Sequence, residues 1–150
     1  MHDIPEAEAR ALLANVLFAH DCPDWSVWKV QPGTSQIDMG LVDAAGIGAR
    51  MQVSLKFHRG PKTNLTHYLF TVYRQEPQGL QRVYQLEVRQ WPKPVKSEHM
   101  RPHEHWGDKR IQGEQSWASW SYEQVLAYFC EQTRIKFEPV PGHPEAFSLK

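Results

Sequence analysis

Three of the chain's eight histidines, His99, His103 and His105, lie in one short segment that also carries arginine, lysine and carboxylate side chains. The ordinary pKa of imidazole, about 6.5, is close to neutrality, so a His-x-His pair is suited to proton transfer or to metal binding. In an extended segment, side chains two residues apart point the same way, so His103 and His105 would converge while Glu104 points away. This segment is therefore the strongest candidate for a chemical site.

Proton transfer is the first interpretation of this segment. Polar residues alternate along the strands expected before it, and a loop that follows those strands can fold back over their polar face. Metal-independent RNA cleavage needs a general base, a general acid and cations that hold phosphate. In this interpretation His103 and His105 are the acid–base pair, and Glu87 orients or assists them. The residues expected to hold phosphate are Arg89, Arg101, Lys109 and Lys56.

Metal binding is the second interpretation. His99, His103 and His105 are ligands of a kind that zinc or another divalent ion accepts. Their spacing matches neither a zinc finger nor the His-Glu-x-x-His helix of metalloproteases. Prolines stand on both sides of His99, and no partner is evident that would orient the rings. We therefore expect no cofactor and no tight metal site. A divalent-metal-binding protein remains an alternative, as does a structural loop whose histidines make only local hydrogen bonds.

The charge of the chain is zero overall but unevenly spread. Residues 1–55 hold three Lys/Arg and seven Asp/Glu (−4), residues 56–110 hold eleven and five (+6), and residues 111–150 hold three and five (−2). A basic middle favours an anionic partner for the central segment. Overall neutrality instead favours a protein partner, because general nucleic-acid binders are usually strongly basic. A non-catalytic inhibitor or adaptor encoded by a mobile element is therefore the main rival to RNA as a partner.

Several classes of protein are poor fits to this sequence. Cys22 and Cys130 are too few for a disulfide framework or a cysteine metal site. No apolar run is long enough for a membrane span and no signal peptide is evident, so we expect a cytoplasmic protein without a membrane partner. Phosphate-binding loops, dinucleotide fingerprints and Gly-x-Ser-x-Gly are absent, which disfavours nucleotide-cofactor enzymes and serine hydrolases.

The elements that must position these residues follow from periodicity and caps. A capping-box pattern at Asp3 and Glu6, with apolar pairs through Phe18, predicts an N-terminal helix. A second helix is expected to start near Ser121, with Gln124 completing its capping box. Alternation predicts five strands at about 25–30, 37–41, 51–57, 68–72 and 84–88, with 135–140 as a last edge strand. We expect one α+β domain over residues 1–150: an antiparallel meander of about five or six strands with both helices on one face, and a loose tail at about 141–150.

Residues 68 to about 129 resemble a class of small, mostly uncharacterised bacterial proteins found near mobile elements and in toxin–antitoxin pairs. The likeness rests on a strand ending in the residues 86–89, on Pro102-His103-Glu104-His105 followed by 107–109, and on a closing amphipathic helix. Toxins of that class are proposed to attack RNA. The resemblance thus implies a small accessory protein that binds or acts on RNA, a toxin-type metal-independent ribonuclease being its enzymatic form. The sequence leaves open whether the protein is an enzyme at all, and its oligomeric state.

Overall fold

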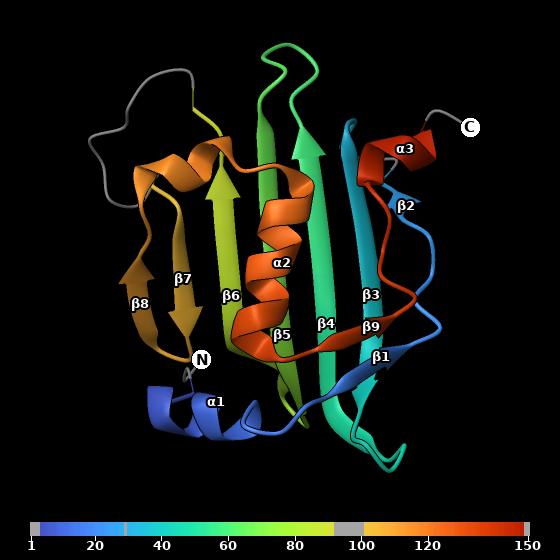
Figure 1. The fold of residues 1–150 in the computed structure, drawn as a ribbon, viewed down its shortest axis with the longest axis vertical. Coiled ribbons are helices and arrows are strands. Elements are labelled where there is room, and N and C mark those ends of the chain that lie inside the picture. The colour runs from blue at the N-terminus through green and yellow to red at the C-terminus, as the bar shows by residue number, and fades with distance from the viewer. Residues whose placement is uncertain (1–3, 29, 92–100, 149–150) are drawn as a thin grey trace.

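The computed structural model describes residues 4–28, 30–91 and 101–148, and folds them into an α+β structure built on one large sheet. The sheet has nine strands in the order β8-β7-β6-β5-β4-β3-β1-β9, with β2 paired to β3 (Figure 1). The prediction of about five or six strands in one antiparallel meander is therefore wrong: β1 and β9 run parallel to each other. The strands are β1 Phe18–His20, β2 Ser26–Val27, β3 Thr34–Val42, β4 Gly48–Arg59, β5 Thr66–Glu76, β6 Gly79–Arg89, β7 His103–Trp106, β8 Lys109–Gln112 and β9 Lys136–Glu138.

The central strands β3 to β6 follow from alternation of apolar and polar side chains. Their apolar positions face one side and are almost fully buried, and β3, β4, β5 and β6 pair in sequence order as hairpins. Alternation along a strand sends successive side chains to opposite faces, so the polar positions of the same strands collect on the other side. We call that second side the open face. The core side chains of these strands include Ile37, Leu41, Met51, Val53, Leu55, Phe57, Tyr68, Phe70, Val72, Tyr84, Leu86 and Val88.

The predicted N-terminal helix is shorter than its apolar pattern indicates. Helix α1 covers Glu6–Leu12, and the chain enters β1 at Phe18. Leu13 and Leu17 are nevertheless buried, at 3% and 5% exposure, because the non-helical chain after α1 still runs along the core. The apolar i,i+4 pairs predicted a helix as far as Phe18, but their side chains are instead held against the core by a turn and a short strand. Tertiary packing overrides local helical periodicity here.

The histidine segment was expected to be a loop, but it forms the hairpin β7–β8. His103 to Trp106 pair with Gln112 to Lys109, and the turn consists of Gly107 and Asp108. Gly107 has φ +56, and a Cβ there would lie 2.1 Å from the carbonyl oxygen of Ile4. Both the left-handed backbone and the close approach require glycine. The hairpin extends the sheet beyond β6 by pairing β7 with it.

The described helices cover one face or one end of the sheet. Helix α2 (Tyr122–Thr133) crosses the core face over β5 and β6, and α1 lies at the end near β6 and β7 (Figure 1). The expected capping box is present: the Ser121 hydroxyl accepts from the Gln124 backbone N–H, and the Gln124 side chain accepts from the Ser121 N–H. A 3-10 turn, Gln115–Ser119, leads into α2. Among the described residues, no helix is both long and apolar enough to cross a membrane.

The segment after β9 is held against the body of the protein over its described part. The Tyr122 hydroxyl donates to the carbonyl oxygen of Pro141, and the Trp25 indole donates to that of Gly142, each at 2.8 Å. Helix α3, Pro144–Ser148, follows directly. Its Glu145 pairs with Arg59 at the end of β4. These contacts connect residues 141–145 to α2, to β4 and to the chain before β2.

Candidate active site

The pairing of strands brings residues from four segments together on the open face. In the β4–β5 register His58 lies opposite His67, and in the β5–β6 register His67 lies opposite Arg89. In the β6–β7 register Glu87 lies opposite His103. Because directly opposite side chains stand on the same face, three imidazoles, one carboxylate and one guanidinium share this part of the sheet. Glu87, Arg89 and His103 were expected to meet, and the structure brings them together.

Glu87 is the centre of this group. Its Oε2 lies 2.7 Å from His67 Nε2, and its Oε1 lies 3.2 Å from His103 Nε2. Arg89 Nη2 is 3.6 Å from the same carboxylate. Burial acts to raise the pKa of Glu87, but hydrogen bonds from His103 and His67 and the charges of these rings outweigh it and hold the pKa far below its ordinary value. Glu87 is therefore an ionised carboxylate that orients two imidazoles.

His103 is buried and has an acceptor at each ring nitrogen. Its exposure is 3%, its Nδ1 lies 2.8 Å from the carbonyl oxygen of Arg101, and its Nε2 faces Glu87. A carbonyl oxygen and a carboxylate both accept, so the ring satisfies both only when it carries both protons. This arrangement engages both ring nitrogens of His103 with protein oxygens. It argues against the expected role of His103 in exchanging protons with a substrate.

His105 lies beside His103 on the open face but in a different environment. The two rings meet edge to face with centroids 5.0 Å apart, and His105 is opposite Gln85 in the sheet. Burial lowers the pKa of His105 to about 4, helped by the positive charges of Arg82, His103 and Arg110. Its Nδ1 is buried without a hydrogen-bond partner among the described residues. His105 is thus neutral at neutral pH and a weak base.

Glu104 points away from the two histidines, to the core face, as alternation predicted. It is 4% exposed and accepts hydrogen bonds from the hydroxyl groups of Tyr84 and Tyr128. It therefore belongs to the packing under α2 and not to the open face.

A pocket of about 360 Å³ adjoins the Glu87 group on the open face. It lies where β4, β5 and β6 meet the loop 60–65, and its walls carry two imidazoles, a guanidinium and an indole. Neither His58 nor His67 was among the candidate site residues that the sequence indicated. The lining residues are Gln31, His58, Gly60, Thr63, Leu65, Thr66, His67, Arg89, Gln90 and Trp91.

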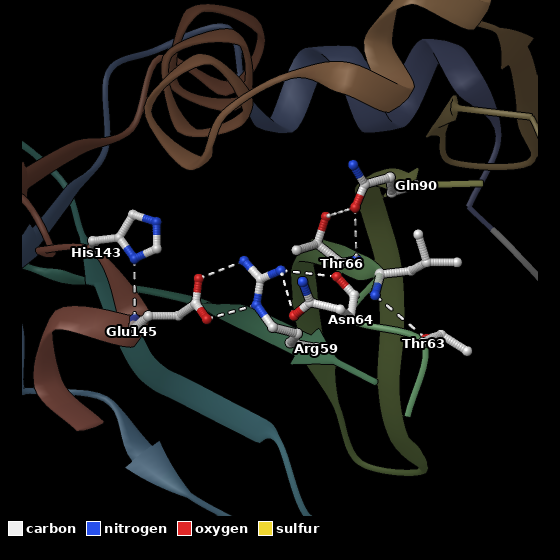
Figure 2. Close-up of polar contacts among 8 residues, drawn as sticks. Arg59, Thr63, Asn64, Thr66, Gln90, His143 and Glu145 are labelled. Carbon is white, nitrogen blue, oxygen red and sulfur yellow. Dashed lines mark hydrogen bonds and ion pairs between the residues drawn. The ribbon is translucent and has the colours of Figure 1, made fainter. Parts of the chain in front are cut away.

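The rim of the pocket is held by hydrogen bonds that Figure 2 shows. Arg59 makes two 2.6 Å contacts to the Glu145 carboxylate and donates from Nη1 to the carbonyl oxygen of Asn64 at 2.9 Å. The Thr66 N–H donates to Gln90 Oε1 at 3.3 Å, joining the start of β5 to the end of β6. Loop 60–65 is therefore connected through Arg59 to helix α3. These hydrogen bonds fix the wall of the pocket to β5, β6 and α3.

His58 and His67 differ in their electrostatic surroundings although they are neighbours. His58 Nδ1 lies 2.8 Å from the Thr34 hydroxyl, and its pKa is lowered by burial and then by the positive charges of His67 and Arg89. His67 instead faces the ionised carboxylate of Glu87. A carboxylate favours the protonated ring, whereas nearby cations favour the neutral one. The pocket therefore holds one imidazole that faces cations beside one that is hydrogen-bonded to a carboxylate.

Comparisons with protein-family models, with curated proteins and with solved structures found no match to this chain.

The expected phosphate-binding residues are not all in one place. Arg89 lines the pocket, and Lys56 lies on the open face with its Nζ 4.3 Å from the centroid of the Trp28 ring. Lys109 is opposite Trp106 in the β7–β8 register, so it belongs to the core-face side of the hairpin. The carbonyl oxygen of Arg101 is bonded to His103 at the start of β7. Arg89 and Lys56 are thus the cations best placed for an anionic ligand.

The alternative metal site depends on a residue outside the described part of the chain. His99 lies outside it, so the set His99, His103 and His105 stays a prediction. Among the residues that the structure describes, no group of three or more His, Cys, Asp or Glu side chains is arranged to hold a metal ion. His103 already directs both ring nitrogens at protein oxygens.

Proposed function

We propose that the chain binds RNA on the open face and cleaves it without a metal ion in the pocket between His58, His67 and Arg89. The observation that carries this proposal is the pairing of two imidazoles with opposite electrostatic surroundings in one pocket, beside a guanidinium. An imidazole that neighbouring cations favour as the neutral form, beside one that is hydrogen-bonded to a carboxylate, suits the roles of general base and general acid. The resemblance of residues 68–129 to toxin-type proteins agrees with this chemistry.

In the proposed reaction, neutral His58 accepts the proton of a ribose 2′-hydroxyl. The 2′-oxygen forms a bond to phosphorus, and the bond from phosphorus to the 5′-oxygen breaks. His67, oriented by its hydrogen bond to Glu87, donates a proton to that leaving oxygen. Arg89 stabilises the extra negative charge on the phosphoryl oxygens. The products are a 2′,3′-cyclic phosphate and a free 5′-hydroxyl, and no group from outside the pocket is consumed.

His103 has a positioning role in this proposal. It holds one oxygen of Glu87 while His67 occupies the other. The sequence-based assignment, with His103 and His105 as the acid–base pair, remains the competing one within the same reaction. Substitution of His105 can distinguish the two assignments. His105 makes no hydrogen bond to Glu87, whereas substitution of His103 would also disturb Glu87.

The test is incubation of the protein with mixed single-stranded RNA in EDTA, followed by analysis of the new ends. We expect 2′,3′-cyclic phosphate ends, and a loss of about 10²–10⁴-fold in rate for His58→Ala and for His67→Ala. His20→Ala is the matched control, since His20 is exposed and pairs with Glu138 away from the pocket. His105→Gln should keep the activity, and a loss there would favour the sequence-based pair. RNA left intact by excess protein would refute cleavage.

A protein partner is the second candidate, and one observation favours it. Exposed apolar side chains gather around β2, where Val27 is 55% and Val30 is 94% exposed. Exposed apolar residues near a short edge strand are common at contact surfaces. A pull-down from host lysate with and without nuclease distinguishes the two: captured protein that survives nuclease and is lost in Val30→Asp would support an adaptor or inhibitor.

A further inference from the structure

Two tryptophans stand on the open face beside the proposed pocket, each against a cation. The Trp28 ring lies over Lys56, whose Nζ is 4.3 Å from the ring centroid, and the guanidinium of Arg89 is 5.5 Å from the Trp91 centroid. Trp28 is 39% exposed, although tryptophan is usually well buried. Trp91 also forms part of the pocket wall. An indole against a cation is a pattern typical of sites that bind single-stranded nucleic acid.

The spacing of these two pairs follows from the sheet. Lys56 is on β4 and Arg89 is on β6, with β5 between them. Neighbouring strands are about 4.8 Å apart, and Arg89 lies two residues, about 6.7 Å, beyond the position on β6 that is in register with Lys56, so the two cations rise from backbones about 12 Å apart. His67 on the intervening strand, and His58 on β4, lie between or beside them. The proposed catalytic imidazoles thus stand within a short strip that has an aromatic ring and a cation at each side.

We propose that the substrate of this site is single-stranded RNA, bound with one unpaired base on Trp91 and another on Trp28. The phosphates on either side of the scissile bond would meet Arg89 and Lys56. This inference rests on the proposed function, because it places the scissile phosphate at His58 and His67. In a duplex the base faces are already stacked within the helix and cannot reach an indole. The site therefore selects unpaired strands through its aromatic rings, while the cations contribute charge without regard to strandedness.

The experiment measures binding without cleavage. The probe is a short fluorescein-labelled oligonucleotide with 2′-O-methyl ribose, which lacks the attacking hydroxyl, titrated with protein in EDTA and followed by anisotropy. We expect the single strand to bind at least about tenfold more tightly than the same strand annealed to its complement. Trp28→Leu and Trp91→Leu should each weaken single-strand binding by about 5- to 100-fold, the range that follows from stacking energies per base.

Two controls separate stacking from charge and from folding. Trp120→Leu makes the same change at a ring that stacks on Trp117 and contacts Tyr128 near α2, away from the open face, and should leave binding unchanged. Inorganic polyphosphate, which has charge but no bases, should bind wild type and both tryptophan variants equally and should weaken with Arg89→Met. Trp28→Phe and Trp91→Phe keep an aromatic face and should restore most of the affinity.

The outcomes for binding and for cleavage are distinguishable. If RNA is cleaved with cyclic ends but single and double strands bind equally, or the tryptophan variants bind as wild type, the aromatic inference is overturned and the proposed function stands. If single strands bind through the tryptophans but RNA is never cleaved, the binding inference stands and cleavage is refuted. If no oligonucleotide binds, both are overturned and the protein-partner alternative is favoured.

Discussion

Replacement of Glu87 by glutamine is the most direct test of the carboxylate at the centre of the site. The carboxylate bridges His67 at 2.7 Å and His103 at 3.2 Å, and its side chain is 24% exposed. The amide of glutamine has one oxygen acceptor, so it can serve one ring as the carboxylate does but turns an N–H toward the other. The ring left facing a donor must lose a proton or lose its hydrogen bond.

The cost can be worked out from these contacts. A hydrogen bond to a charged group contributes about 1.5–3 kcal/mol, and removal of one partner leaves the other unsatisfied. We expect Glu87→Gln to lower the free energy of unfolding by about 2–3 kcal/mol at pH 7, measured by urea denaturation. The matched control is Glu6→Gln, which breaks the exposed pair with Arg10 on α1 and should cost no more than about 0.5 kcal/mol.

The pH dependence of the same difference checks its electrostatic origin. The pKa of Glu87 is lower in the folded protein than in the unfolded chain, where it is about 4.3. The contribution of Glu87 to stability is therefore complete above the unfolded pKa and is lost as the pH falls through the folded pKa. The difference in the free energy of unfolding between wild type and Glu87→Gln should thus persist at neutral pH and become smaller as the pH falls below about 4. A variant as stable as the Glu6→Gln control, or a difference that does not become smaller in acid, would refute the reasoning.

Three further changes have clear expected outcomes. The folded pKa of His105, about 4, lies below the ordinary 6.5, so wild type should lose stability as the pH falls from 6.5 toward 4. In urea titrations the free energy of unfolding of His105→Gln should change less with pH over this range, and an equal change in both proteins would contradict this. Tyr128→Phe removes a hydrogen-bond donor to buried Glu104 and should lower the free energy of unfolding by about 1.5–3 kcal/mol, measured by thermal unfolding. The control Tyr73→Phe, on the open face, should lower it by no more than about 0.5 kcal/mol, and equal losses would show that Glu104 does not need the hydroxyl. Gly107→Ala should lower the free energy of unfolding by more than about 2 kcal/mol, since its Cβ would lie 2.1 Å from the Ile4 carbonyl oxygen. The control Gly46→Ala, at φ +82 but in open space, should lower it by about 1 kcal/mol, and similar losses at both sites would refute the steric argument.

The parts of the fold that could be predicted are those where local pattern and tertiary environment agree. Alternation in β4 and β5 identified both the strands and the faces they bury, and the Ser121 and Gln124 capping box marked the start of α2. The hairpin β7–β8 conflicted with local pattern because Glu104 is buried in the core. Its charge is satisfied by tyrosines from two distant segments, and nothing near Glu104 in the sequence indicates them.

The candidate site could be predicted only in part, for a related reason. Glu87, Arg89 and His103 share a face by alternation and proximity along the chain. The pairing of His58 with His67 depends on the register that loop 60–65 imposes on β4 and β5. Alternation puts both imidazoles on the polar face, but it does not tell which residue of β5 lies opposite His58. Burial of His103 likewise depends on packing that the composition of its segment does not reveal.

The parallel pair β1–β9 has a consequence for the order in which the protein can be completed. Phe18 is opposite Lys136, so β1 cannot gain this neighbour until residues 136–138, more than a hundred positions later, have been synthesised. Until then the backbone of β1 on that side presents unpaired donors and acceptors, which are a template for association with other chains. Contacts between residues so distant in sequence also slow folding. The pairing of β9 with β1 is therefore expected to form late in folding, and a chain truncated before Lys136 should aggregate through the edge that β9 covers.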